Sequence, residues 1–208
     1  MTDLLLVRHA RPVRHDAAPG AEPDPDLGDI GRAQAAALAG WLAAEPIDAL
    51  WSSPMLRARR TAEPLAAATG LDVRLLDELR EITVGERSYI PVEEMTAADS
   101  ALTDAWAAAI AGGDANPVVR AFRERVMAGL DVIATAHPDQ RVAVTCHGGV
   151  VNAALTAVLG ISELAIVPIR YTAVTRLRFR PSGDRTVLTV NETAHLQVES
   201  RRVTCPVP

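Results

Sequence analysis

Apolar residues form two kinds of run along this chain, short dense runs and longer runs with helical spacing. The dense runs predict strands, since a strand covered on both faces of a parallel sheet lacks polar alternation; they lie at residues 4–7, 47–51, 71–76 and 141–145. Helical spacing marks four segments: about 31–44, 54–68, 118–136 and 150–159. Two strands at 172–179 and 185–191, joined by a Pro-Ser-Gly turn, close the pattern. This alternation predicts an α/β fold, a three-layer α/β/α sandwich around a mostly parallel sheet.

The length of 208 residues suits one well-buried α/β domain and is short for two, so we expect a single domain over residues 1–208. The regular pattern is lost over 83–117, where glycines, prolines and an Ala-rich patch predict a partly helical cap insertion over the ligand edge of the sheet. Residues 13–29 are rich in Pro, Asp, Gly and Ala and predict a loop over the strand ends. Residues 204–208 are expected to form a loose tail.

Candidate chemistry follows the predicted strands directly. Arg8 and His9 come at the end of the first strand, and His147 and Gly148 come at the end of the strand over 141–145. Open α/β sheets bind ligands at the carboxyl ends of their strands, and glycines at the start of a helix leave amide donors for an anion. Arg57 falls in the first turns of the helix that we expect to begin at Ser52-Ser53-Pro54, with serine as its cap. These residues are therefore expected at one edge.

The basic residues exclude two kinds of chemistry. All 21 of them are arginine and lysine is absent, so neither a Schiff-base lysine nor the lysine of a Walker-type phosphate loop is present. A net charge of −5 and a pI near 5.5 argue against a nucleic-acid surface. In a mildly acidic protein, a cluster of arginines is therefore informative about a local site more than about the surface as a whole.

The two cysteines, Cys146 and Cys205, form neither a disulfide framework nor a metal set. Cys146 does not fit a cysteine phosphatase loop, which needs an arginine six residues later, where this chain has Asn152. The first apolar run is too short for the core of a signal peptide, and no run is long enough to span a membrane. We therefore expect a cytoplasmic protein without a membrane partner.

Five segments, in this order, resemble motifs of the histidine phosphatase superfamily, the phosphoglycerate mutase-like proteins. They are Val7-Arg8-His9-Ala10, the stretch 27–35 from Leu27 to Ala35, the arginine motif 52–62, the acid motif 79–86 and the second histidine motif 144–150. The resemblance implies a phosphoglycerate mutase-like sheet. It also implies a phosphatase that hydrolyses a small phosphate monoester without metal or cofactor, through a phosphohistidine on His9.

Each candidate residue has a role in this reading. Arg8 and Arg57 would bind the phosphoryl oxygens through paired hydrogen bonds, since phosphoryl transfer asks mainly for positioning and positive charge. His147, with the amide of Gly148, would donate to a phosphate oxygen. Glu81 would protonate the leaving alkoxide and then take a proton from water; its neighbours Glu78 and Glu86 are rivals for this role.

The chain departs from the family pattern at two places. His15 stands where many members have a phosphate-binding Asn, and it is a candidate for that contact. The usual Trp-Glu-Gly after the acid motif is replaced by Arg87-Ser88-Tyr89-Ile90-Pro91. This departure affects what the resemblance implies for the substrate pocket more than what it implies for the chemistry. Two alternatives remain open: a phosphoglycerate mutase that retains the phosphohistidine, and a catalytically silent phosphate-binding regulatory module. The sequence specifies neither the substrate nor the oligomeric state.

Overall fold

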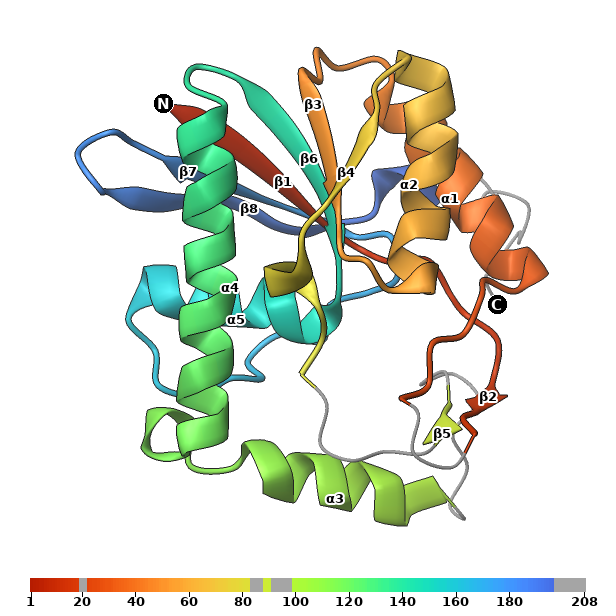
Figure 1. Cartoon of the computed structure of the whole chain (residues 1–208), viewed down its shortest axis with the longest axis vertical. Coiled ribbons are helices and arrows are strands. Elements are labelled where there is room, and N and C mark those ends of the chain that lie inside the picture. Colours follow the sequence, from red (N-terminus) through yellow and green to blue (C-terminus); the bar gives the residue numbers. More distant parts are fainter. Residues whose placement is uncertain (19–21, 83–87, 91–98, 197–208) are drawn as a thin grey trace, which may run out of the picture.

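The centre of the protein is a six-stranded sheet with the order β4-β3-β6-β1-β7-β8 (Figure 1). The structure is a computed structural model that describes residues 1–18, 22–82, 88–90 and 99–196, with the backbone alone described at 100–103 and 106. β1 pairs in parallel with β6, β6 with β3 and β3 with β4, whereas β7 runs antiparallel to both β1 and β8. The strands are β1 (Thr2–Arg8), β3 (Ala49–Ser52), β4 (Val73–Leu75), β6 (Arg141–Cys146), β7 (Val174–Phe179) and β8 (Arg185–Glu192).

Helices cover both faces of this sheet, which confirms the predicted three-layer α/β architecture (Figure 1). Successive residues of β1 point to opposite faces, and Leu5 packs with α1 and α2 while Leu4 and Leu6 pack with α4 and α5. All three leucines are buried, and burial on both faces of the sheet explains why the sequence of β1 is a continuous apolar run. The helices are α1 (Asp29–Leu42), α2 (Leu56–Thr69), α3 (Ser100–Ile110), α4 (Pro117–Ala136) and α5 (Gly148–Leu159), and short 3-10 turns span Asp77–Leu79, Gly113–Ala115 and Ala194–Leu196.

The start of α2 differs from the prediction. The helix begins at Leu56, after an extended Met55, and Ser53 does not cap it. The side chain of Ser53 is instead fully buried and its hydroxyl lies 2.8 Å from Nε2 of His147. Ser53, which the local pattern predicted as the helix cap, is therefore a buried residue that contacts His147.

Smaller elements lie beyond the carboxyl ends of the parallel strands. β2 (His15–Asp16) pairs antiparallel with β5 (Ser88–Tyr89), and α3 crosses the same side of the molecule (Figure 1). Of the expected cap over 83–117, the segments 83–87 and 91–98 lie outside the described residues, as does the expected tail over 204–208. Within the described part of the chain, no helix has the length and apolar character needed to cross a bilayer.

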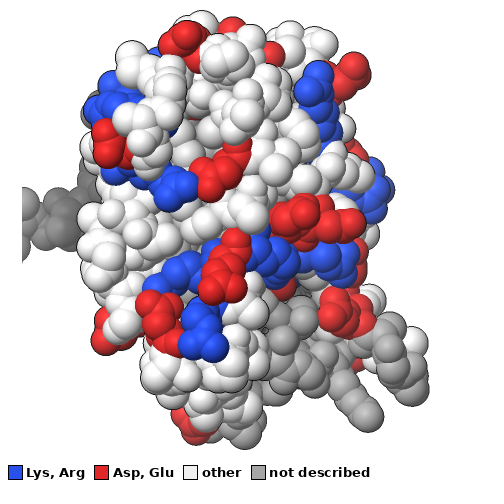
Figure 2. All heavy atoms as spheres, turned by 60° about the vertical axis from the view of Figure 1, so that its left-hand side comes forward, with Lys and Arg blue, Asp and Glu red and all other residues white. Residues whose placement is uncertain are grey.

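The face formed by α4 and the β7–β8 hairpin carries mixed charge. Figure 2 shows arginine side chains interleaved with aspartates and glutamates there. Arg185 of β8, for example, pairs with Asp131 of α4 at 2.6 Å, and Arg123 of α4 pairs with Asp114 at 2.6 Å. These arginines are engaged with carboxylates of the same chain.

Candidate active site

Three parallel strands deliver the candidate residues to one edge of the sheet. The register places Arg8 at the end of β1 beside Cys146 at the end of β6. The next amide, that of His9, donates to the Cys146 carbonyl at 2.8 Å, and the amide of Ser53 donates to the Thr145 carbonyl at 2.9 Å. Main-chain hydrogen bonds thus continue past the strand ends and fix the residues that follow them.

His9 has a defined tautomer. Its Nδ1 lies 2.8 Å from the carbonyl oxygen of Ala10; because a carbonyl only accepts, Nδ1 carries the proton and Nε2 carries a lone pair. The side chain is buried, and burial together with the positive charges of Arg57 and Arg8 holds the pKa of His9 well below its usual range. Thr61 of α2 steadies the following residue by accepting a hydrogen bond from the Ala10 amide at 2.9 Å. His9 is therefore a neutral imidazole with a basic lone pair on Nε2.

Arg8 and Arg57 place guanidinium groups around this imidazole. Nη1 of Arg8 donates to the Ile169 carbonyl at 2.6 Å, while Nε of Arg8 and both Nε and Nη1 of Arg57 are buried without a hydrogen-bond partner among the described residues. The remaining group of Arg57, Nη2, is 3.5 Å from the sulfur of Met55. Buried donors without acceptors are costly, so these arginines are arranged for an anion.

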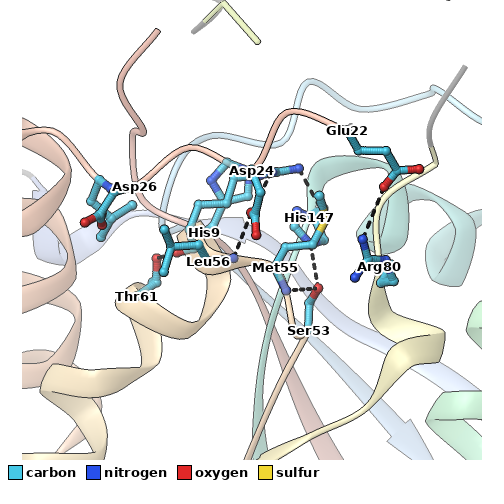
Figure 3. Close-up of polar contacts among 12 residues, drawn as sticks. His9, Glu22, Asp24, Asp26, Ser53, Met55, Leu56, Thr61, Arg80 and His147 are labelled. Carbon is cyan, nitrogen blue, oxygen red and sulfur yellow. Dashed lines mark hydrogen bonds and ion pairs between the residues drawn. The ribbon is translucent and has the colours of Figure 1, made fainter. Parts of the chain in front are cut away.

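His147 follows β6 and lies beside His9. The two ring centroids are 5.2 Å apart, and His147 is fully buried. Its Nε2 meets the hydroxyl of Ser53 at 2.8 Å (Figure 3), whereas its Nδ1 is buried and has no partner among the described residues. Burial and the nearby charge of Arg57 hold the pKa of His147 well below its usual range, so the ring is neutral.

Glu81 reaches the same place from the segment after β4. One carboxylate oxygen accepts from the amide of Gly149 at 3.0 Å and the other from the amide of Ile82 at 3.0 Å. A side chain at Gly149 would collide with this carboxylate, so glycine is required for the close approach. Burial raises the pKa of Glu81 in spite of these two amides and the charges of Arg57 and Arg8. A carboxyl with a raised pKa is suited to donate a proton near neutral pH.

The two tyrosines of the chain both lie at this site, and sequence reasoning missed them. The guanidinium of Arg8 stacks 3.9 Å from the ring centroid of Tyr171, and that of Arg57 lies 4.9 Å from the ring centroid of Tyr89. The rings also approach His9, at centroid distances of 5.7 Å for Tyr171 and 6.4 Å for Tyr89. Cation–π contacts of this kind hold a guanidinium in place without using its hydrogen-bond donors. The one local signal was the place of Tyr89 in the segment that departs from the family pattern.

An acidic loop, part of the segment 13–29 that was predicted to lie over the strand ends, crosses the front of the site, and its carboxylate contacts were not predicted. The carboxylate of Asp24 accepts a hydrogen bond from the Leu56 amide at the start of α2, at 2.8 Å, and lies 3.6 Å from Nη1 of Arg57 (Figure 3). Glu22, two residues earlier, pairs with Arg80 at 3.2 Å. The loop therefore places a negative charge beside Arg57.

The remaining candidates lie at the margin or outside. Gly148 is the first residue of α5, beside the side chain of Arg8. His15 is exposed on β2, opposite Tyr89 in the small ribbon, and its contact with phosphate stays a prediction. Cys146 is buried and its thiol pKa is raised by burial, as expected for an inert cysteine. Among the residues described, no cluster of three or more His, Cys, Asp or Glu side chains is placed to hold a metal ion.

The arrangement contains the parts that phosphoryl transfer needs. A basic nitrogen, two arginines with buried donors, a neutral imidazole and a carboxyl with a raised pKa converge from four separate segments. Groups of these kinds can act on the phosphorus, the equatorial oxygens and the leaving oxygen of a phosphate ester. Glu86, a rival for the acid role, lies outside the described residues.

Comparison with known proteins agrees with this geometry. The sequence profile of the histidine phosphatase superfamily (branch 1) matches residues 4–193. Phosphoserine phosphatase 1 of Hydrogenobacter thermophilus is 32% identical over 171 residues, which cover 77% of this chain and 78% of that protein.

Solved structures share the fold. Bacillus stearothermophilus YhfR superposes with a TM-score of 0.76 at 22% identity and covers 94% of this chain and 100% of its own. A mycobacterial glucosyl-3-phosphoglycerate phosphatase superposes with a TM-score of 0.72 at 24% identity and covers 92% of this chain and 99% of its own. The chain belongs to the histidine phosphatase superfamily, branch 1, and is a phosphatase of that superfamily.

Proposed function

We propose that this enzyme hydrolyses a small phosphate monoester without a metal ion, through a phosphohistidine on His9. The observation that carries the proposal is the tautomer of His9: the Ala10 carbonyl holds the proton on Nδ1 and leaves Nε2 as a nucleophile. The buried donors of Arg8 and Arg57 beside it supply the positive charge that the transferring phosphoryl group requires.

The first half-reaction transfers the phosphoryl group to the enzyme. Nε2 of His9 forms a bond to phosphorus while the bond from phosphorus to the ester oxygen breaks. Glu81 gives its proton to the departing alkoxide, and this step is favoured by the raised pKa of Glu81. His147 donates to an equatorial oxygen as negative charge gathers there.

The second half-reaction releases the phosphate. Glu81, now ionised, takes a proton from a water molecule, the water oxygen attacks phosphorus, and the bond between phosphorus and Nε2 breaks. Inorganic phosphate leaves, and His9 and Glu81 return to their starting protonation states. Water is the only other reactant, so protons and electrons balance over the cycle.

Relatives indicate which esters to test. One relative is named a phosphoserine phosphatase and one structural neighbour a glucosyl-3-phosphoglycerate phosphatase. A phosphoserine phosphatase from Entamoeba histolytica, with the same fold, was solved with 3-phosphoglyceric acid. Small phosphate esters that carry a carboxylate are therefore the first class to try.

The test is release of inorganic phosphate from a panel of small phosphate esters that includes phosphoserine and 3-phosphoglycerate, with and without excess EDTA. We expect turnover of at least one ester, unchanged by the chelator. Loss of turnover with EDTA and recovery with one divalent ion would contradict the mechanism. Interconversion of 3- and 2-phosphoglycerate faster than phosphate release would favour a mutase, and binding of phosphate without any turnover would favour a silent regulatory module.

A further inference from the structure

Two consecutive serines end β3, and both are fully buried. The hydroxyl of Ser52 donates to the carbonyl oxygen of Ser53 at 2.7 Å, which uses its proton locally. The hydroxyl of Ser53 has two neighbours: the amide of Met55 at 3.3 Å and Nε2 of His147 at 2.8 Å (Figure 3). Only the second serine therefore contacts the active-site histidine, across 94 residues of sequence.

The hydrogen bond between Ser53 and His147 has two possible directions. If Nε2–H donated, the Ser53 oxygen would accept from both the imidazole and the Met55 amide, and the hydroxyl proton would have no acceptor among the described residues. If the hydroxyl donates, it gives its proton to the Nε2 lone pair and accepts from the Met55 amide. The first direction leaves two buried groups without a partner among the described residues, the hydroxyl proton and the Nδ1 lone pair, whereas the second leaves only Nδ1–H. Buried polar groups are almost always satisfied, so the second direction is favoured.

The direction of this bond decides where His147 carries its proton. The ring is neutral, because burial and the arginine charges lower its pKa, so it has one ring proton. An Nε2 that accepts from Ser53 leaves that proton on Nδ1, the buried atom that has no partner among the described residues. Nδ1 thereby joins the unsatisfied donors of Arg8 and Arg57 as a third group able to meet an anion.

We propose that Ser53 is a positioning residue that holds His147 in the tautomer protonated on Nδ1 and so makes His147 a hydrogen-bond donor to the phosphoryl group. The proposal rests on the proposed function for its catalytic consequence, whereas the tautomer is a property of the free enzyme. The opposite tautomer would turn a lone pair toward the phosphate oxygens. One donor to developing negative charge is typically worth about 10²-fold or more in rate.

The direct test reads the tautomer by long-range ¹H–¹⁵N correlation spectra of the free, uniformly ¹⁵N-labelled protein. Protonated and unprotonated ring nitrogens resonate in well-separated regions, and the spectrum of His147→Gln assigns the His147 signals by their loss. We expect Nδ1 of His147 to be the protonated nitrogen in the wild type. Protonation on Nε2 instead would overturn the proposal, even if Ser53→Ala failed to fold.

The variants separate positioning from packing. Ser53→Ala is expected to shift the His147 proton toward Nε2 and to lower kcat/KM about 10²-fold. Ser52→Ala is the matched control: it removes an equally buried hydroxyl that does not touch His147, and it should leave the tautomer unchanged. An Nδ1-protonated His147 in folded Ser53→Ala would overturn the proposal. If no ester is hydrolysed, the proposed function fails, but the spectra still decide the tautomer.

Discussion

Two pairs of arginines in this protein use the same side chain in opposite ways. Arg176 and Arg178, on β7, are engaged by carboxylates: Arg178 binds both oxygens of Asp3 at 2.7 and 2.9 Å, and Arg176 pairs with Glu45 and with Glu192. Arg8 and Arg57 are held by a carbonyl, a sulfur and two tyrosine rings. One carboxylate, that of Asp24, lies 3.6 Å from Arg57, yet both arginines keep buried donors without hydrogen-bond partners among the described residues. Charge alone does not distinguish the pairs, but the state of their donors does.

The carboxyl groups of the two regions differ in the direction of their pKa shifts. The hydrogen bond from Arg178 lowers the pKa of Asp3, and that from Arg176 lowers the pKa of Glu45. At the active site, burial raises the pKa of Glu81 despite two nearby arginines. The β7 region therefore neutralises its own charges, as structural ion pairs do. The strand-end region combines cations that keep unsatisfied donors with an acid of raised pKa, as functional sites often do.

The largest effect on activity is expected when an arginine of the strand-end pair is removed. Arg57→Ala should lower kcat/KM by roughly 10³-fold, because an arginine that meets the transferring phosphoryl group contributes this much in other enzymes. The thermal stability of Arg57→Ala should stay the same or rise, since two buried donors without hydrogen-bond partners among the described residues, Nε and Nη1, are removed. The measurements are steady-state kinetics and thermal unfolding of the same preparations.

Arg178→Ala is the matched control and should give the opposite result. Its melting temperature should fall, because Asp3 loses both of its hydrogen bonds from Arg178, while kcat/KM stays within about twofold. If both variants lost activity and stability together, the distinction between the two pairs of arginines would be wrong.

The next effect concerns Glu81. A proton donor matters most for a poor leaving group, so Glu81→Gln should slow hydrolysis of an alkyl phosphate about 10²-fold and that of p-nitrophenyl phosphate much less. Glu78→Gln, a nearby acid that does not contact Gly149, should change neither rate. Equal losses for both esters in Glu81→Gln, or a leaving-group effect confined to Glu78→Gln, would remove the acid role from Glu81.

The pH profile follows from the directions of two pKa shifts. Glu81 donates when protonated, and its pKa lies above the ordinary value of 4.5, so kcat/KM for an alkyl ester should fall about tenfold per pH unit above that raised pKa. His9 attacks when neutral, and its pKa lies well below 6.5, so its protonation lowers activity only at acid pH. With the same ester, Glu81→Gln should lose the alkaline limb. An alkaline limb retained in Glu81→Gln would assign it to another group.

The smallest effect is expected at the acidic loop. Asp24→Asn keeps an oxygen for the Leu56 amide but removes the charge 3.6 Å from Arg57, so the inhibition constant of inorganic phosphate should fall about three- to fivefold. Asp26→Asn is the matched control: Asp26 pairs with Arg32 and Arg60 and should not affect phosphate binding. Weaker phosphate binding in Asp24→Asn would show that this carboxylate supports the site instead of competing with phosphate.

The sequence predicted the parts of the fold that depend on local patterns. The strand over Leu4–Val7 and the sheet strand that ends at Cys146 were predicted because their apolar runs are dense, and the edge at which they meet follows from parallel strand order. The sheet and its flanking helices are confirmed. Arg8, His9, Arg57, Glu81 and His147 do lie together, and their catalytic roles stay predictions.

Residues whose contacts are distant in sequence were not predictable. Ser53 has the local signature of a helix cap, yet its partner is a histidine 94 residues away. Tyr89 lies in a segment that departs from the family pattern, and only its pairing with β2 brings it over Arg57. His137 and His195 are both buried outside the site, and His137 accepts a hydrogen bond from the Trp51 indole at 3.1 Å. Such contacts depend on the folded sheet and not on neighbouring residues.

The most direct test of the central claim is to trap the phosphoryl group on the enzyme. The protein is mixed with substrate, denatured at alkaline pH within the time of one turnover, because phosphohistidine is labile to acid, and digested for mass spectrometry. We expect one phosphorylated peptide, carrying the group on His9, and no phosphopeptide and no turnover from His9→Ala. His137→Gln, in a buried histidine outside the site, should label normally. Near-normal turnover by His9→Ala, or a phosphoryl group on another residue, would contradict the mechanism.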